Sequence, residues 1–213
     1  MNIVLFGPPG AGKGTQAQKL VEQHNYCQIS TGDLLRNEAK KKTDLGIKIE
    51  NLISKGEFVS DEIVNELLKK KISSLKDKNK IIFDGYPRTI SQSEELIKIM
   101  EDFHQKIDCV ISLNVPREII QKRIAGRVTC EKCNITLNEY FDKEKITSLS
   151  CKGAHLIKRK DDNLETILNR YDKYISTTKP VLDFLSNSLS IEEVDGTLKI
   201  EEIFDKINNI IRV

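Results

Sequence analysis

The sequence predicts an α/β protein in which a five-stranded parallel β-sheet is flanked by helices. Short apolar runs, typical of buried strands, recur along the chain, and helical patterns separate them. Because strands and helices alternate at this spacing, the strands are expected to run parallel, with a ligand crevice beyond their carboxyl ends. The five runs are Ile3–Phe6, Cys27–Ile29, Ile81–Phe83, Cys109–Val115 and Leu189–Val194.

The segments between the runs carry signals of helices. One helix is expected to begin at Ser60 and to end near Lys69–Lys71, with acidic residues in its first turn, a polarity that suits the helix dipole. Pro116 fits the first turn of a helix that runs toward Arg127. Two further segments place residues at helical spacing: Ala17, Leu20, Val21 and His24, and then Ile200, Ile203, Phe204, Ile207 and Ile211.

Two segments interrupt this alternation and are interpreted as insertions. Residues 30–59 are mostly helical in pattern, begin at Ser30-Thr31-Gly32-Asp33 and close around Gly56. Residues 127–160 lack helical periodicity and contain three cysteines, so they are expected to form a small excursion from the sheet. The core is then expected to comprise residues 1–29, 60–126 and 161–213.

Composition and charge narrow the class of protein. The chain has 213 residues, with 34 basic and 32 acidic side chains and a net charge of +2. This balance gives no strong field for nucleic acid or an anionic membrane, and neither partner is expected. No apolar run approaches the ~18 residues of a membrane span, and the first residues do not resemble a signal peptide. We expect a cytoplasmic protein, whose odd number of cysteines indicates one metal site plus two buried thiols, Cys27 and Cys109.

A phosphate-binding loop follows the first predicted strand and opens the first helix. Its sequence is Gly7-Pro8-Pro9-Gly10-Ala11-Gly12-Lys13-Gly14-Thr15. Glycines let backbone amides turn toward an anion, the helix start adds positive potential, and Lys13 can reach the terminal phosphates. The motif therefore predicts a nucleoside triphosphate site rather than a glycine-rich turn with a solvated lysine. Gly14 departs from the Ser or Thr that many such loops have there, which leaves Thr15 to donate to phosphate or metal.

Several arginines favour a kinase over other proteins that have such a loop. Phosphoryl transfer spreads negative charge over the equatorial oxygens, so a kinase for a phosphate acceptor needs fixed cations around both substrates. The planar guanidinium binds phosphate in a bidentate way and keeps its charge. A lone arginine is as often a solvated surface residue, so the surrounding motifs decide. The candidates are Arg36, Arg88, Arg123, Arg127, Arg159 and Arg170.

The motifs around these residues resemble those of the long-lid adenylate kinases, nearly end to end. The resemblance implies the P-loop nucleoside monophosphate kinase fold, with residues 30–59 as the AMP-binding domain and 127–160 as the lid. It also implies the conversion of ATP and AMP to two ADP, in a monomer. The shared segments are Thr15-Gln16-Ala17-Gln18, Ser30-Thr31-Gly32-Asp33-Leu34-Leu35-Arg36, Asp84-Gly85-Tyr86-Pro87-Arg88-Thr89 with Gln92, Arg123-Ile124-Ala125-Gly126-Arg127, and Arg159-Lys160-Asp161-Asp162 with Arg170.

On the acceptor side, the resemblance implies an AMP pocket. Gln92 can give and accept hydrogen bonds at an adenine edge, and Arg36 and Arg88 can clamp the acceptor phosphate. The alternative for Gln92 is an exposed helix residue. Arg159 and Arg170 are implied to bridge the two substrates. The other residues implied in the pocket are Thr31, Glu57, Phe58, Val59, Gly85, Tyr86 and Pro87.

On the donor side, the resemblance implies that Arg123 and Arg127 contact ATP beside the glycine-rich loop. Asp84 resembles the acidic residue that holds Mg²⁺ through its water shell, with a turn cap as the alternative. Leu198 stands where the family often has a lysine whose backbone meets the ATP adenine. Thr136 and Leu137 stand where relatives commonly have an aliphatic and an aromatic residue, so stacking there is expected to be weaker.

No covalent nucleophile is needed, because positioning and charge stabilisation carry such a reaction. The residues expected to act in this way on the transferred group are Lys13, Arg88, Arg123, Arg159 and Arg170.

The cysteines of the second insertion have the spacing of a zinc site. Cys130 and Cys133 form a close pair, and Cys151 follows at a separation close to that of zinc ribbons. Relatives with a zinc lid have Cys or Asp where this chain has Ala154, so the fourth ligand is open. We favour His155 over Asp142, water or no metal. Such a metal would stabilise the lid without entering the chemistry.

Three other functions compete with this interpretation. One is a nucleoside monophosphate kinase for UMP and CMP or for GMP, against which Thr31, Gln92 and the long lid argue. Another is a P-loop switch or motor, which leaves the arginine motifs and the 30–59 insertion unexplained. The third treats the cysteine region as a nucleic-acid-binding zinc module, but acidic residues interrupt its basic and aromatic ones.

Overall fold

The predicted strands form one parallel sheet. The structure, a computed structural model, describes residues 1–133, 135–159 and 162–212. The strand order is β2-β3-β1-β4-β8, and each neighbouring pair is parallel. The predicted fold class is therefore confirmed. The strands span β1 Ile3–Phe6, β2 Cys27–Ser30, β3 Ile81–Asp84, β4 Cys109–Asn114 and β8 Ser190–Asp195.

Two apolar cores lie on opposite faces of this sheet. In β1, Ile3 and Leu5 belong to one core, whereas Val4 and Phe6 belong to the other, because successive strand residues point to opposite faces. All four side chains are buried. A strand that is buried on both faces has no polar alternation, which is why these strands are continuous apolar runs in the sequence.

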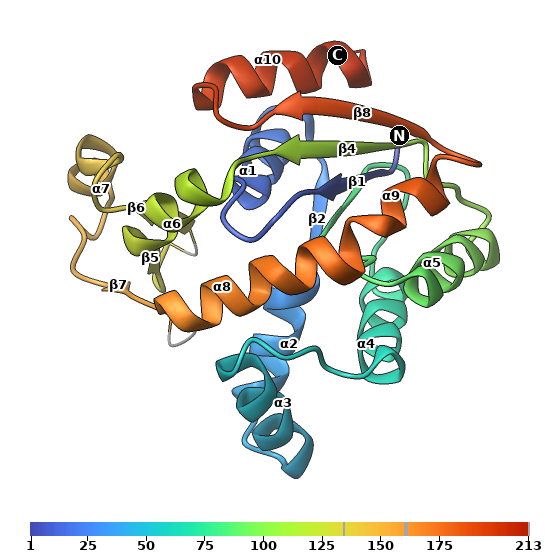
Figure 1. The fold of residues 1–213 in the computed structure, drawn as a ribbon, viewed down its shortest axis with the longest axis horizontal. Helices are drawn as coiled ribbons and strands as arrows, with labels where there is room; N and C mark the ends of the chain where they lie inside the picture. Colours follow the sequence, from blue (N-terminus) through green and yellow to red (C-terminus); the bar gives the residue numbers. More distant parts are fainter. Residues whose placement is uncertain (134, 160–161, 213) are drawn as a thin grey trace.

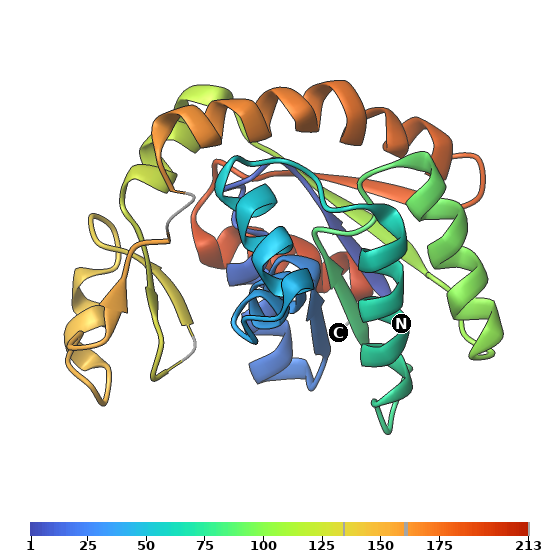
Figure 2. The same cartoon turned by 90° about the horizontal axis from the view of Figure 1, so that it is seen from below.

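Helices cover both faces of the sheet (Figure 1, Figure 2). Ala17 of α1 and Ile207 of α10 pack in the first core, and Leu68 of α4, Leu96 of α5 and Val181 of α9 pack in the second. Among the helices described, none has the length and apolarity to cross a lipid bilayer. The helices of the main body span α1 Lys13–His24, α4 Asp61–Ser73, α5 Ile90–Asp102, α6 Arg117–Ala125, α9 Pro180–Leu185 and α10 Ile200–Ile211.

Residues 30–59 contain two helices, α2 Thr31–Ala39 and α3 Asp44–Ser54, which project away from the sheet in Figure 1. Ser30 and Thr43 cap them, since each hydroxyl accepts a hydrogen bond from the amide three residues later, at 3.3 and 3.1 Å. Ile49 of α3 is fully buried and belongs to the second core. The insertion is therefore packed against the main body.

The second insertion contains a separate antiparallel sheet with the order β6-β5-β7. Its strands span β5 Arg127–Cys130, β6 Ile135–Asn138 and β7 Leu156–Ile157, and a short helix, α7 Lys143–Ser148, follows β6. The sequence analysis expected no helix in this segment. Four residues lie outside the described part of the chain: 134 and 160 of the expected lid range, and 161 and 213 of the expected core range. Two of them, Lys160 and Asp161, belong to the shared motif.

A helical segment that the sequence analysis missed arches over the sheet in Figure 2. It comprises α8 Leu164–Lys173, a π-helical turn η1 Tyr174–Thr178, and α9. Within it, the amide of Lys179 donates to the carbonyl oxygen of Tyr174 at 2.7 Å, five residues earlier. This wider turn changes the helix register, and π turns of this kind are frequent at functional sites. Tyr174 and Thr178, at its two ends, are both buried.

Two local expectations differ from the structure. Pro116 precedes α6 as its cap instead of lying in the first turn, because its ψ of 151° is extended. Cys109 is buried as expected, but Cys27 is only half-buried, since β2 is the edge strand of the sheet.

Replacing Ile82 by alanine is expected to lower the free energy of unfolding by about 2–5 kcal/mol, because a fully buried side chain leaves a cavity in β3, between β1 and β2. Urea denaturation followed by circular dichroism measures this loss. Ile47→Ala is the matched control, because Ile47 on α3 is 51% exposed and its truncation is expected to cost about 0.5 kcal/mol or less. Equal losses in both variants would contradict the core described above.

Candidate functional site

A loop with left-handed glycines joins β1 to α1. Gly7, Gly10 and Gly12 have φ values of 140°, 80° and 100°, which residues with a side chain rarely adopt. A Cβ atom at Gly10 would lie 2.8 Å from Cγ1 of Ile124. A loop of this type that leads directly into a helix amino terminus binds phosphate through its backbone amides. The structure therefore agrees with the predicted phosphate-binding loop.

Lys13, the first residue of α1, turns back onto this loop. Its Nζ donates to the carbonyl oxygens of Gly7 at 2.8 Å and Pro8 at 3.0 Å. The pKa of Lys13 is lowered to about 8, mainly by burial; the positive charges of Arg88 and Arg127 contribute to this shift, and Asp84 opposes it. An anion that binds here would stabilise the ammonium form of Lys13 and so offset the cost of burying its charge.

The carboxylate of Asp84 lies beside the loop, at the carboxyl end of β3. Its Oδ2 accepts a hydrogen bond from Nε2 of Gln28 at 3.0 Å and lies 3.8 Å from the place that a Cβ atom would take at Gly14. A carboxylate oxygen next to a phosphate-binding loop suits a hard cation such as Mg²⁺.

A cleft of about 830 Å³ opens beyond the carboxyl ends of the strands. This volume lies in the range of small-molecule sites. Every residue that was predicted to bind a nucleotide lines it. They are Gly10, Ala11, Gly12, Lys13, Gly14, Thr15, Thr31, Arg36, Glu57, Phe58, Val59, Asp84, Gly85, Tyr86, Pro87, Arg88, Gln92, Arg123, Arg127, Thr136, Leu137, Arg159, Arg170 and Leu198.

Gly85 organises one side of the cleft. Its carbonyl oxygen accepts hydrogen bonds from Oγ1 of Thr31 at 2.8 Å and from Nε of Arg88 at 2.7 Å. Its φ is 76°, and a Cβ atom there would lie 3.1 Å from Nη2 of Arg88 and 3.3 Å from Oγ1 of Thr31. A side chain at this position would therefore displace the two groups that the turn holds in the cleft.

Positive charge accumulates around Arg88. The pKa of Arg88 is lowered to about 10, mainly by burial; Arg170 and Arg36 contribute to this shift, and Asp84 opposes it. The guanidinium carbon of Arg88 lies 5.5 Å from the centre of the Phe58 ring, within cation–π distance. Arg36 pairs with Asp33 at 2.5 Å. This side of the cleft can therefore hold a phosphate between several guanidinium groups.

Gln92 is buried, and its amide already has partners. Its Oε1 accepts from the backbone amide of Arg88 at 2.7 Å, and its Nε2 donates to Oδ1 of Asp61 at 2.6 Å. The exposed-helix alternative is excluded, because the side chain is only 3% exposed. An amide nitrogen has two hydrogens, so one further donor is available for a ligand.

On the other side of the cleft, Arg123 links two loops. Its two terminal nitrogens donate to the carbonyl oxygens of Ala11, at 3.2 Å, and Gly196, at 2.8 Å. Arg123 thus connects the glycine-rich loop with the turn after β8, where Leu198 lines the cleft. Burial lowers the pKa of Arg123, and Asp195 opposes the shift.

Two arginines of the second insertion line the same cleft: Arg127 begins β5, and Arg159 follows β7. Arg127 forms a bidentate pair with Asp162, in which Nε donates to Oδ2 at 2.7 Å. Arg159 donates to the hydroxyls of Thr129 at 3.3 Å and Thr136 at 3.1 Å. The pKa of Arg159 is lowered to about 10, mainly by burial and in part by repulsion from Arg36 and Arg127. This repulsion links the cations of the two insertions electrostatically.

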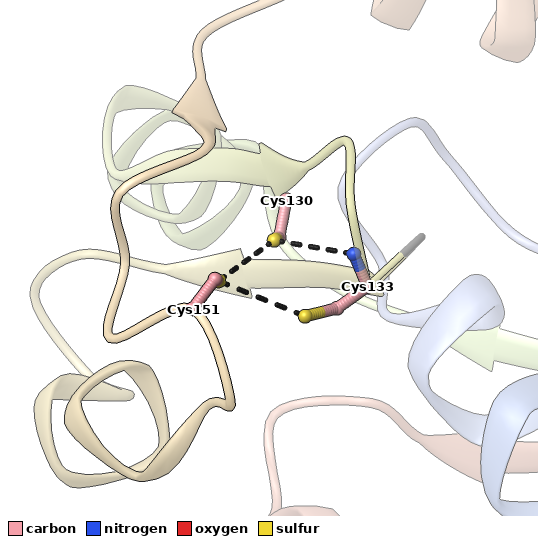
Figure 3. Close-up of side chains that lie close together, drawn as sticks. All are labelled: Cys130, Cys133 and Cys151. Carbon is pink, nitrogen blue, oxygen red and sulfur yellow. Dashed lines mark hydrogen bonds between the residues drawn. The ribbon is translucent and has the colours of Figure 1, made fainter.

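Three cysteines approach one another in the small sheet (Figure 3). Cys130 ends β5, Cys133 follows in the next turn, and Cys151 lies after α7. The Cys130 and Cys151 sulfurs are 3.4 Å apart, the Cys133 and Cys151 sulfurs are 3.7 Å apart, and all three lie within 4.8 Å of one another. Sulfurs at this spacing can bind one metal ion together.

Hydrogen bonds within the cluster shift two of the thiols in opposite directions: the bond with Cys130 raises the pKa of Cys133, whereas the pKa of Cys151 is lowered. The amide of Cys133 donates to the sulfur of Cys130 at 3.4 Å. Burial raises the pKa of the Cys151 thiol, but a hydrogen bond from Cys130 and the backbone amides of Gly153 and His155 outweigh it, so the net shift is downward.

The favoured fourth ligand is not brought into this cluster. The side chain of His155 is exposed, and among the described residues no His, Asp or Glu joins the three sulfurs within 4.8 Å. The alternative Asp142 accepts from the backbone amide of Asn138 at 2.9 Å and lies 3.6 Å from Nζ of Lys145.

Sequence analysis missed the residues that orient the predicted ones. They are Gln28 beside Asp84, Asp33 beside Arg36, Asp61 beside Gln92, and Thr129 beside Arg159. Tyr174 and Thr178, which line the cleft, were not predicted either. Asp33 could have been found, because it lies three residues before Arg36 on a predicted helix. The others come from elements that only the fold brings together.

Comparisons with known proteins agree with this geometry. A sequence model of the family described as adenylate kinase matches residues 5–189. An adenylate kinase of Pelagibacter ubique (strain HTCC1062) is 59% identical over 213 residues, which is 100% of both chains. Adenylate kinases of Carboxydothermus hydrogenoformans and Staphylococcus epidermidis are 40% and 39% identical, over 100% and 99% of each chain. The similarity therefore covers the whole cleft.

Binding of inorganic triphosphate at pH 8 is expected to take up as much as about half a proton through Lys13, because its pKa of about 8 rises when an anion stabilises the ammonium form. At pH 6.5 the group is already protonated, so this uptake is expected to disappear. Calorimetry in buffers of different ionisation enthalpy measures the protons exchanged. Lys13→Met is the control that subtracts the ligand's own titration. Identical proton exchange in both proteins at pH 8 would contradict the assigned role of burial.

Proposed function

The chain belongs to the adenylate kinase family, and from that premise we propose how its cleft performs the family's reaction, the reversible transfer of a phosphoryl group from ATP to AMP that yields two ADP. One observation carries the proposal. The glycine-rich loop and the six candidate arginines line a single cleft. A cleft with one anion site at a helix terminus and a second ring of guanidinium groups can hold two nucleotides with their phosphates facing each other.

ATP binds on the side of the glycine-rich loop. The backbone of Gly10–Thr15 surrounds its phosphates, and Lys13 exchanges the carbonyl oxygens of Gly7 and Pro8 for phosphate oxygens. Arg123, Arg127 and the turn at Leu198 contact the donor nucleotide, with Thr136 and Leu137 as the covering strand. The support for this assignment is that Arg123 already connects the loop with the turn before Leu198.

Adenylate kinases use Mg²⁺ with ATP. The residues fit this ion, because Asp84 presents a carboxylate at the end of β3, close to Gly14. Asp84 would hold the ion through its water molecules, and the ion supplies charge neutralisation to the phosphates. Gln28 keeps the carboxylate in place through its hydrogen bond.

AMP binds on the side of residues 30–59. Its phosphate lies between Arg36 and Arg88, and its adenine lies toward Gln92, which offers its remaining amide hydrogen. Thr31, the backbone of 57–59 and the turn at Gly85 complete the pocket. The hydrogen bonds that Gly85 accepts from Thr31 and Arg88 support this arrangement, because they fix both side chains before AMP arrives.

Transfer proceeds directly between the two nucleotides. Arg159 and Arg170 bridge the substrates, and with Lys13, Arg88 and Arg123 they stabilise the charge on the transferred group. Burial removes cations such as Lys13 and Arg88 from water, and electrostatic stabilisation by a desolvated cation is stronger than in water. No residue forms a covalent intermediate.

Residues 30–59 act as the AMP-binding domain and residues 127–160 as the lid. The core comprises residues 1–29, 60–126 and 161–213. Closure of both insertions excludes water from the reaction, and opening releases the products. The cleft is formed by one chain, so a monomer carries a complete site. The reaction takes place in the cytoplasm, where thiols such as those of the lid stay reduced.

The lid binds Zn²⁺ through Cys130, Cys133 and Cys151. The support is the donor set itself, because three sulfurs within 4.8 Å of one another suit this ion. When bound, the ion would tie the turn after β5 to the segment after α7 and so stabilise a unit with little apolar core.

Arg88→Ala and Lys13→Ala are each expected to lower kcat for ADP formation from ATP and AMP by roughly a hundredfold or more, because each removes a cation that stabilises the transition state. A coupled spectrophotometric assay measures the rate. Comparison of AMP with CMP, UMP and GMP as acceptors tests the alternative monophosphate specificity.

Arg117→Ala is the matched control for these variants. Arg117 lies on α6 and makes a long pair with Asp172 at 3.7 Å, outside the residues that line the cleft. Its activity is expected to stay within about twofold of the unsubstituted enzyme, since an exposed pair contributes little. Full activity of Arg88→Ala would refute the assigned acceptor site.

Purified protein is expected to contain about one zinc per chain, and Cys133→Ala is expected to lose the metal and to lower Tm, because two ligands hold zinc poorly. Metal analysis and thermal denaturation measure the two effects. Cys27→Ala, in β2, is the control that keeps its zinc. Zinc-free protein together with an unchanged Tm in Cys133→Ala would remove the zinc assignment.

A further inference from the structure

The metal site of the lid has an asymmetric donor set. In the first half of the site, Cys130 is followed three residues later by a second cysteine, Cys133. In the second half, Cys151 is followed three residues later by Ala154, which has no ligand atom. Ala154 is exposed, and its amide donates to the carbonyl oxygen of Cys151 at 2.9 Å, so the turn is present but carries a methyl group. The second half of the site therefore supplies one thiolate where the first half supplies two.

Among the residues that the structure describes, no side chain near the cluster fills this gap. The backbone of His155 supports the site, since its carbonyl oxygen accepts from the amide of Glu131 at 3.1 Å, but its imidazole is exposed and outside the sulfur cluster. The hydroxyl of Ser150 lies 3.9 Å from the sulfur of Cys133. A serine hydroxyl is not among the usual zinc ligands, which are thiolate, imidazole and carboxylate.

The cluster is also open to solvent on one side. Cys130 is buried, whereas Cys133 and Cys151 are only half-buried, and Cys133 lies on the wall of the nucleotide cleft. In Figure 3 the side chains of Cys130, Cys133 and Cys151 point toward one another. A small molecule from solvent can therefore reach an ion that these sulfurs hold.

We propose that the lid binds zinc through three thiolates and leaves one coordination position to a water molecule, which a small exogenous ligand can replace. This inference rests on the zinc binding proposed above. Zinc sites with three protein ligands and one water are typical of exchangeable positions, whereas sites with four protein ligands are closed. The metal of this lid is consequently easier to remove than that of a four-ligand site, so cohesion of the lid depends on zinc supply.

The test uses the full-length protein loaded with Co²⁺ or Zn²⁺, together with Ala154→Cys, His155→Ala and Ser150→Ala. X-ray absorption of the zinc form is expected to show three sulfur ligands and one oxygen. Imidazole is expected to change the visible d–d bands of the cobalt form. The zinc form of Ala154→Cys is expected to show four sulfur ligands, and its cobalt form is expected to lose the response to imidazole. The variant is also expected to release zinc to a chromogenic chelator about a hundredfold more slowly, because the protein then supplies a fourth ligand.

Each outcome separates this inference from the zinc assignment itself. His155→Ala and Ser150→Ala are expected to match the unsubstituted protein in spectrum and in zinc release. Loss of one light ligand or much faster release in either variant would overturn the inference, because that side chain would then be the fourth ligand. Visible d–d bands of the cobalt form that do not change when imidazole is added would overturn the inference as well. Failure of the protein to bind Co²⁺ or Zn²⁺ at all would instead overturn the proposed zinc lid.

Discussion

The site depends on positive charges that the fold buries close together before any anion binds. Lys13, Arg88 and Arg159 all have lowered pKa values, and in each case burial is the largest cause and neighbouring arginines add to it. Such a cluster is costly in the empty protein, but it does not need to reorganise when negative charge develops on a phosphoryl group. Preorganised charge of this kind is the main source of catalysis in phosphoryl transfer.

Backbone carbonyls and a few carboxylates offset the cost of burying these charges and of their mutual repulsion. Lys13 is held by two carbonyl oxygens of its own loop, Arg88 by that of Gly85, and Arg123 by those of Ala11 and Gly196. Neutral acceptors orient a cation without cancelling its charge, so it stays available to a phosphate. The carbonyls belong to loops at the carboxyl ends of the strands, which explains why a parallel sheet supports the site.

Much of this arrangement could be predicted from the sequence, because its determinants are local. The strands are buried on both faces and therefore appear as apolar runs, and the glycine-rich loop carries its own conformational signal. The remaining cleft residues were predicted from the family resemblance of the motifs that contain the arginines. By contrast, the α8–η1–α9 segment was missed, and so was the contact of Gln28 with Asp84, which joins side chains 56 positions apart. The expectation for His155 relied on spacing alone, whereas the structure uses its backbone and leaves its imidazole exposed.

The central claim is that one ring of cations gathers two nucleotides with their phosphates facing each other. Calorimetric titration with two adenosines joined by five phosphates tests it most directly, because that molecule spans both sides of the cleft. The account predicts one molecule bound per chain, far more tightly than either ATP or AMP, and complete exclusion of both nucleotides. Two molecules bound per chain, or AMP that still binds to the saturated protein, would contradict it.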